Sequence, residues 1–168
     1  ADQEAVRQYL HEHGADFKGT DHQIDTYFDA PEGRLKLRQG PIENNLIFYQ
    51  RADTDGPKQS TINLSPVAPD STIGEVLTAA LGVRVVVNKQ REIYFIDNVK
   101  FHIDTVQGLG NFVEIEAIDT DGKRNAKELE QQCSHYMREL GIKATDLVVG
   151  SYSDLLEGAT LSELAADN

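Results

Sequence analysis

Charged side chains stand at every second position in several short stretches of the sequence. Arg34, Lys36 and Arg38 alternate with leucines, and a β-strand would place these three cations on one face. Glu114 and Glu116 repeat the pattern with carboxylates. Arginine and lysine hold phosphate oxygens, and carboxylates hold Mg²⁺ or Mn²⁺. The two patterns together indicate binding of a polyphosphate with its metal ion.

Two further stretches share this period of two. Lys100, His102 and Asp104 alternate with apolar residues, and Lys89 and Arg91 stand two apart. For any one strand, the simplest interpretation is the solvated face of a one-sided sheet. The set argues otherwise, because aligned cations repel one another and the basic and acidic residues segregate by strand. If the sheet closes, its polar face becomes a lumen with a cationic and an anionic wall.

His102 is the candidate general base, because it shares the polar face and its ordinary pKa suits neutral pH. A hydrogen-bonded wall residue is the alternative. The sequence contains no Cys/His cluster that would indicate zinc. It also lacks a G-x-S-x-G elbow and a P-loop, neither of which phosphoryl transfer requires.

A mainly antiparallel sheet would position these residues. Alternating stretches between turn signals predict strands at Gln23–Phe28, Arg34–Arg38, Leu46–Arg51, Ser60–Val67, Val83–Asn88, Glu92–Ile96, Lys100–Thr105 and Phe112–Ile118. Helical spacing predicts helices at 4–13, Ser71–Leu81 and Ala126–Leu140, with a short one beginning at Ser151. The predicted class is α+β.

The composition narrows the possible functions. The length of 168 residues suits one domain, and the net charge of −12 argues against general nucleic-acid binding. No apolar run approaches the ~20 residues that span a bilayer, and the first ten residues do not resemble a signal peptide. The single cysteine, Cys133, lies on an apolar helical stripe, which predicts a core position. One cysteine cannot form an internal disulfide, which fits a reducing compartment. We therefore expect a cytoplasmic protein.

An ordered series of short motifs resembles the CYTH superfamily, which includes class IV adenylate cyclases, thiamine triphosphatases and inorganic tripolyphosphatases. The resemblance covers about residues 4–156. Its motifs lie at His22–Phe28, Gly33–Arg38, Tyr49–Asp53, Gly56–Ser60, Asn88–Arg91, Phe101–Asp104, Gly108–Glu116 and Ser151–Leu156.

The resemblance implies an eight-stranded antiparallel β-tunnel with flanking helices, which holds a triphosphate and one or two divalent ions. It implies that Asp104, Glu114 and Glu116 approach the Mg²⁺ or Mn²⁺. The residues expected to bind the triphosphate are Arg34, Lys36, Arg38, Arg51, Lys58, Lys89, Arg91 and Lys100. Gln50 stands at a position where many members have lysine, so Arg51 can replace that charge only if the strand bulges.

Family members open with an E-x-E-x-K strand before the first helix. The present sequence begins almost at that helix, so the first strand is expected to be missing from it. Truncation is the favoured explanation, and a degenerate family member that has lost the strand is the alternative. The predicted domain covers residues 1–156, and 157–168 are predicted to be an acidic, flexible tail.

The leading hypothesis is a metal-dependent enzyme that converts ATP to cyclic AMP and pyrophosphate, as a class IV adenylate cyclase does. One alternative is hydrolysis of thiamine triphosphate, a nucleoside triphosphate or tripolyphosphate. Another is a non-catalytic polyphosphate-binding module, and a third is an interaction domain with a solvated charged face. The expected partner is a small-molecule triphosphate, without nucleic acid or membrane, and the chain is expected to be a monomer or homodimer.

Overall fold

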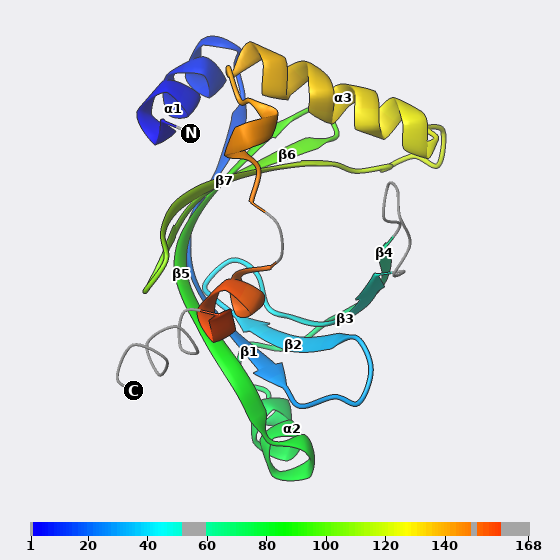
Figure 1. Ribbon diagram of the computed structural model, residues 1–168. Helices are drawn as coiled ribbons and strands as arrows, with labels where there is room; N and C mark the ends of the chain where they lie inside the picture. The colour runs from blue at the N-terminus through cyan, green and yellow to red at the C-terminus, as the bar shows by residue number, and fades with distance from the viewer. Residues whose placement is uncertain (1, 52–59, 149–150, 159–168) are drawn as a thin grey trace. The chain divides into compact units, whose positions relative to one another are not determined.

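The strands pair into one sheet in the order β4-β3-β2-β1-β5-β6-β7 (Figure 1). The computed structural model describes residues 2–51, 60–148 and 151–158. Neighbouring strands pair antiparallel where their register is defined, so the predicted α+β class with an antiparallel sheet is confirmed. The described residues contain seven strands, compared with the eight that the resemblance implied.

The elements in chain order are α1 (Gln3–Glu12), β1 (Asp16–Phe28), β2 (Arg34–Gln39), β3 (Asn45–Arg51), β4 (Ser60–Pro66), α2 (Ile73–Leu81), β5 (Val83–Ile96), β6 (Val99–Val106), β7 (Gly110–Ala117), α3 (Ala126–Glu139) and the 3₁₀ turn η1 (Ala144–Asp146). Residues 152–158 are also helical. The chain divides into two compact units, Ala1–Thr20 with Gln90–Val149 and Asp21–Lys89 with Gly150–Asn168. No helix among the described residues is long and apolar enough to cross a membrane.

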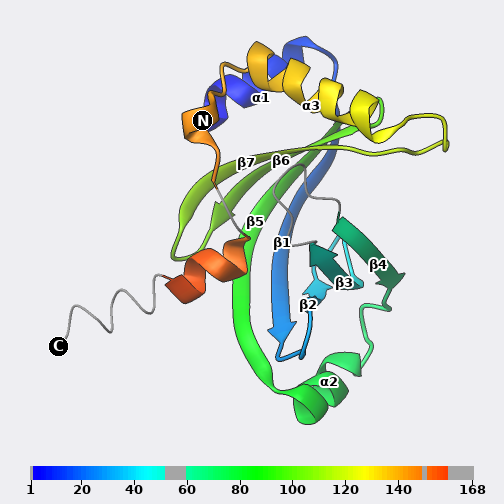
Figure 2. The same ribbon diagram turned by 45° about the vertical axis from the view of Figure 1, so that its right-hand side comes forward.

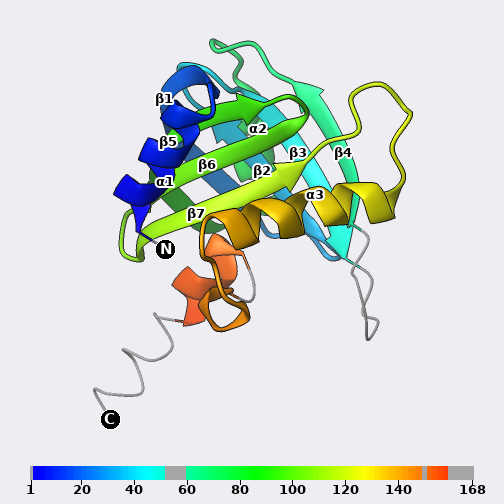
Figure 3. The ribbon, with the colours of Figure 1, turned by 90° about the horizontal axis from the view of Figure 1, so that it is seen from above.

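The first unit builds its core between helices and strands. Helices α1 and α3 lie over the face of β6 and β7 (Figure 3). Leu10 of α1 and Phe101 of β6 are fully buried there, and the Tyr136 ring meets Phe101 edge-on at 5.0 Å. Because β6 alternates, its apolar residues enter this core and its charged residues lie on the opposite face.

The second unit places α2 beside the end of β1 and the start of β5 (Figure 2). Gly74 of α2 is so close to β2 that an added Cβ would lie 3.0 Å from Leu37 Cδ2. Leu37 is therefore buried, while its neighbour Arg38 projects to the other face of β2. Of the cations on this other face, Arg38 is buried, whereas the Lys36 and Arg34 side chains are 14% and 31% exposed.

Two predicted strands, Val83–Asn88 and Glu92–Ile96, are one continuous strand, β5. The prediction of a break was wrong because the charged residues between them are buried. Lys89 donates a hydrogen bond to a carboxylate, and so does Arg91. Because each cation is paired with a carboxylate, both can be buried, and the backbone of β5 continues through them without a break.

Strand β1 begins at Asp16 rather than at the predicted Gln23. Its first residues are polar and include a glycine, so they show little apolar alternation. Phe17 nevertheless stacks on Tyr94 of β5 with ring centroids 4.8 Å apart. Aromatic pairing between strands extends β1 beyond the part with a clear sequence pattern.

Candidate functional site

Asp25 of β1 is the centre of a buried charged cluster in the second unit. Arg38 of β2 donates hydrogen bonds from Nε and Nη2 to its two oxygens, at 3.0 and 2.9 Å. Lys89 of β5 donates from Nζ to Oδ2 at 2.7 Å, and Lys36 Nζ lies 3.7 Å from the same oxygen. We call these four residues the Asp25 cluster. Sheet register brings them together, since Asp25 pairs directly with Arg38.

Burial makes this cluster electrostatically strong. The side chains of Asp25 and Lys89 are 2% and 1% exposed. Burial alone would raise the pKa of Asp25, but Arg38, Lys89 and Lys36 outweigh it and hold that pKa well below its usual range. Asp25 is therefore ionised at any physiological pH, and three cations converge on one carboxylate.

Lys36 is oriented by two tyrosines as well as by Asp25. Its Nζ lies 5.5 Å from the ring centroid of Tyr27 and 5.6 Å from that of Tyr49, within the range of cation–π attraction. Lys36 Nζ also donates a hydrogen bond to the Tyr27 hydroxyl at 3.4 Å. Burial raises the pKa of Tyr27, so this hydroxyl stays protonated.

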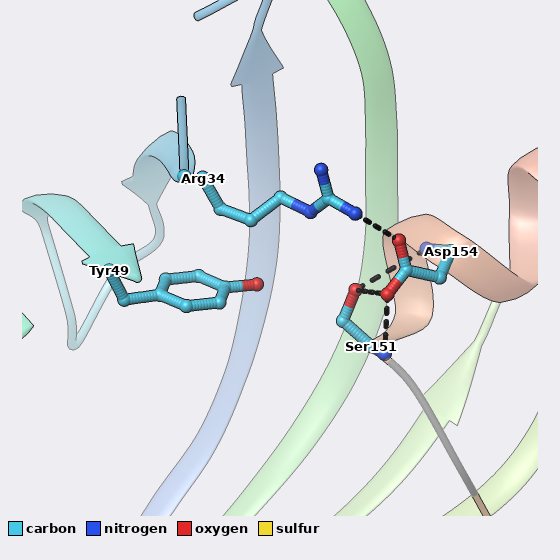
Figure 4. Close-up of a pocket in the computed structure, with 5 residues that line it drawn as sticks. Arg34, Tyr49, Ser151 and Asp154 are labelled. Atoms are coloured by element: carbon cyan, nitrogen blue, oxygen red, sulfur yellow. Dashed lines mark hydrogen bonds and ion pairs between the residues drawn. The ribbon is translucent and has the colours of Figure 1, made fainter. Parts of the chain in front are cut away.

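A cavity of about 200 Å³ lies within the same unit, lined by Gly33, Arg34, Tyr49, Ser151 and Asp154. Arg34 Nη2 donates to Asp154 Oδ1 at 2.5 Å, and the second carboxylate oxygen accepts from Ser151 (Figure 4). The predicted helix start at Ser151 is confirmed, because the Ser151 hydroxyl accepts from the Asp154 amide. Tyr49 connects the two sites, since it lines this cavity and also faces Lys36.

A second charged cluster lies in the first unit, and we call it the Arg91 cluster. Arg91 donates from Nε and Nη2 to both oxygens of Asp104, at 2.8 and 2.7 Å. Its Nη2 also donates to Glu114 Oε2 at 3.3 Å. His102 Nδ1 lies 3.0 Å from that same Glu114 oxygen. Arg91, His102 and Asp104 are all buried.

His102 is held in its neutral form. Burial lowers its pKa, and although the Glu114 hydrogen bond opposes this, Arg91 and Lys100 lower it further. Because a carboxylate only accepts, Nδ1 carries the proton that is donated to Glu114. Nε2 is buried and has no hydrogen-bond partner among the described residues. The geometry thus leaves an acceptor atom available, while the role of general base stays a prediction.

The predicted metal ligands are Asp104, Glu114 and Glu116, of which Asp104 and Glu114 both accept from Arg91 Nη2. Among the residues that the structure describes, no three Asp, Glu, His or Cys side chains lie where they could hold a metal ion. Both Asp104 oxygens accept from Arg91, whereas Glu114 and Glu116 alternate on β7 and are exposed. These residues alone do not form a complete Mg²⁺ or Mn²⁺ centre, and their part in metal binding stays a prediction.

The remaining predicted residues have three different outcomes. Lys100 pairs across strands with Glu116, and its Nζ lies 5.9 Å from the ring centroid of Phe95. The register of β3 with β4 continues through Gln50 and Arg51 without a bulge, so the condition for Arg51 to replace a lysine is not met. Lys58 lies outside the described residues.

Sequence reasoning missed Asp25, Tyr27 and Asp154. A signal for the first two was present, because Asp21, Gln23, Asp25 and Tyr27 alternate along β1 just as the basic residues do along β2. Asp154 stands three residues after a serine, which is the spacing of a helix capping box. Neither pattern by itself indicates which cation the carboxylate binds.

Comparison with known proteins identifies relatives over most of the chain. The model of the CYTH domain family matches residues 1–152. A relative named adenylate cyclase CyaB, from Aeromonas hydrophila, is 27% identical over 143 residues, which cover 79% of this chain and 71% of the relative.

Solved structures share the fold. The PH1012 protein from Pyrococcus horikoshii OT3 has a TM-score of 0.78 and 26% identity, over 92% of this chain and 94% of that one. The PH1819 protein from the same organism has a TM-score of 0.69 and 22% identity, over 95% of both chains.

Proposed function

This chain belongs to the CYTH domain family, and on that premise we propose that it is an enzyme of the class IV adenylate cyclase type, acting on the triphosphate of ATP. The Asp25 cluster is the observation that carries the proposal. Its three cations reach one carboxylate from two strands; Arg38 and Lys89 are buried, and the Lys36 side chain is 14% exposed. A solvated charged face, one of the alternatives considered from the sequence, does not agree with this burial.

The proposed role of Lys36, Arg38 and Lys89 is to bind phosphate oxygens and to neutralise the charge that develops during phosphoryl transfer. Arg38 presents a planar fork that fits two oxygens, whereas the lysines act as point charges. At low local dielectric these contacts are stronger than in water. Positioning and neutralisation are the main requirements of this reaction class, and the cluster suits both.

The cavity beside the cluster supports a substrate with an organic part. Tyr49 lines the cavity and contacts Lys36, so a triphosphate held by Lys36 would have its attached group near an aromatic ring. The relative named adenylate cyclase supports ATP over thiamine triphosphate. Hydrolysis of a triphosphate remains the second candidate, because the same cations would serve it.

Mg²⁺ or Mn²⁺ is the proposed cofactor on the ground of the family resemblance. Glu114 and Glu116 offer two exposed carboxylates, while Mg²⁺ takes about six oxygen ligands. The substrate's phosphates, water and other protein groups would therefore supply most of the coordination. The tunnel, the monomeric or dimeric state and the domain limits of 1–156 also stay proposals.

The test is incubation of the protein with ATP, thiamine triphosphate or tripolyphosphate, each with Mg²⁺, Mn²⁺ or EDTA. We expect cyclic AMP and pyrophosphate from ATP with a metal ion. Lys36→Ala should lower kcat/KM at least about tenfold. Lys123→Ala, which changes an exposed loop residue, should leave it unchanged. Phosphate release without cyclic AMP would favour the hydrolase, and binding without turnover would favour the non-catalytic module.

A further inference from the structure

We propose that Asp25 is a positioning residue for the triphosphate: its carboxylate, although negative, increases the affinity of the cluster for the anionic substrate. The inference rests on the proposed function, because it assumes that Lys36, Arg38 and Lys89 bind phosphate. It goes beyond that function by giving a role to an anion placed among the cations.

The first argument is geometric. Long basic side chains have many rotamers, and ordering each one costs conformational entropy. Three like charges would also move apart if nothing opposed their repulsion. Asp25 accepts from Arg38 and Lys89 and lies near Lys36. It therefore orders the cations before any phosphate arrives.

The second argument concerns the charge of Lys89. Its side chain is almost fully buried, and burial favours the neutral form of a lysine whereas a nearby anion favours the charged form. Asp25 Oδ2 lies 2.7 Å from Lys89 Nζ and favours the protonated form. Removing the carboxylate would thus remove one negative charge while favouring loss of a neighbouring positive one.

A simple electrostatic view predicts the opposite effect. If Asp25 only competed with phosphate for the cations, its removal would free them, and triphosphate would bind more tightly. The two views differ in the sign of one measurable quantity, the change in affinity caused by Asp25→Asn. Both carboxylate oxygens contact cations, so asparagine would direct an N–H group at one of them.

Asp21 provides a matched control on the same strand. It is equally buried, but its oxygens accept from the amides of Ile42 and Glu43 and from the Gln23 side chain. Asp21→Asn makes the same chemical change to a buried carboxylate that holds a loop. It should affect stability without removing a direct contact to the three cations. Its one link to them is indirect, because Asp21 accepts from the Glu43 amide and Glu43 Oε1 lies 3.8 Å from Arg38 Nη1.

The experiment is calorimetric titration of the full chain with inorganic tripolyphosphate, for wild type, Asp25→Asn and Asp21→Asn, with the melting temperature of each variant. We expect Asp25→Asn to weaken binding at least about tenfold, and Asp21→Asn to change it less than about threefold. Asp25→Glu, which keeps the charge, should recover part of the loss. Equal or tighter binding by Asp25→Asn would overturn the inference and leave the proposed function standing.

Absence of tripolyphosphate binding by the wild type would instead overturn both. If Asp25→Asn does not fold, the double variant Asp25→Asn/Lys89→Met takes its place, because it removes a buried pair of opposite charges. Its affinity is then compared with that of Lys89→Met alone. A larger loss in the double variant supports positioning of Lys36 and Arg38 by Asp25, and an equal or smaller loss contradicts it.

Discussion

The ionisation of Asp25 is tied to folding because its partners come from strands that are distant in sequence. Arg38 and Lys89 donate to it from β2 and β5, and these contacts form only when the strands pair. A buried charge network whose members are hydrogen-bonded favours one arrangement of its side chains. Removing Asp25 would take a hydrogen-bonded carboxylate away from the buried Lys89, which is costly.

This linkage predicts how stability depends on pH. Arg38, Lys89 and Lys36 hold the Asp25 pKa below the value of about 4 expected for an unfolded chain. The carboxylate therefore contributes stability above about pH 4, and that contribution is lost as the pH falls towards the folded pKa. In urea unfolding, wild type should exceed Asp25→Asn in stability most at pH 7, and the difference should shrink below about pH 4. A constant difference would contradict the prediction.

At the residue scale, the sequence predicted which basic residues lie on the polar face of a strand. It did not predict which carboxylate each of them contacts. Lys36, Arg38, Lys89 and Arg91 were expected on the polar faces of their strands, and each lies beside a carboxylate. Arg38, Lys89 and Arg91 are also buried. Period two is a local property, so it can be read directly. The choice of Asp25 or Asp104 as the partner depends on strand order and register, which no local pattern contains.

At the scale of elements, the helix at 152–158 also shows that a local sequence pattern does not indicate contacts with distant parts of the chain. Its start at Ser151 could be predicted, but its attachment to the sheet could not. Arg34 of β2 binds Asp154, and Arg84 of β5 binds Glu157. Glu157, which the prediction placed in the flexible tail, is thus helical and paired.

Asp154 should matter more to this helix than Glu157. The Arg34–Asp154 and Arg84–Glu157 ion pairs are similarly exposed, and a pair of this kind contributes about 0–1 kcal/mol. Asp154 differs from Glu157 because it also accepts hydrogen bonds from Ser151 at the helix start. We expect Asp154→Asn to increase hydrogen exchange of the 152–158 amides, and Glu157→Gln to leave it nearly unchanged. Equal exchange in the two variants would show that the cap does not hold the helix.

Most strands and helices were predictable because apolar alternation and helix stop signals are strong in this sequence. The two exceptions are the continuous β5 and the early start of β1. Each depends on a tertiary contact, namely the burial of Lys89 and Arg91 and the stacking of Phe17 on Tyr94. Where contacts between residues distant in sequence determine the limits of a strand, the local pattern of apolar residues does not predict those limits.

At the scale of the molecule, strands β1 and β5 run through both compact units. Stability at this scale depends on the apolar core, in which Leu10 is fully buried. Leu10→Ala should cost about 2–5 kcal/mol, measured by chemical unfolding. Leu147→Ala, at a position that is 55% exposed, should cost less than about 0.5 kcal/mol. If Leu10→Ala lowers the free energy of unfolding as little as Leu147→Ala does, α1 contributes little to the core.

The net charge of −12 is compatible with a site for an anionic ligand because the cations are concentrated where the chain is buried. Recognition depends on the local field, which can have the opposite sign from that of the whole surface. Composition alone therefore argued against general nucleic-acid binding, but it could not indicate a small anionic substrate.

Because three cations share one carboxylate, the substitutions that this protein can accept during evolution are interdependent. A substitution at Lys36, Arg38 or Lys89 alters the environment of the other two through Asp25. Effects of mutations at residues in direct contact are not additive. A library of variants at these four positions should therefore show strong epistasis. More double variants should stay functional than the sum of the effects of their single substitutions predicts.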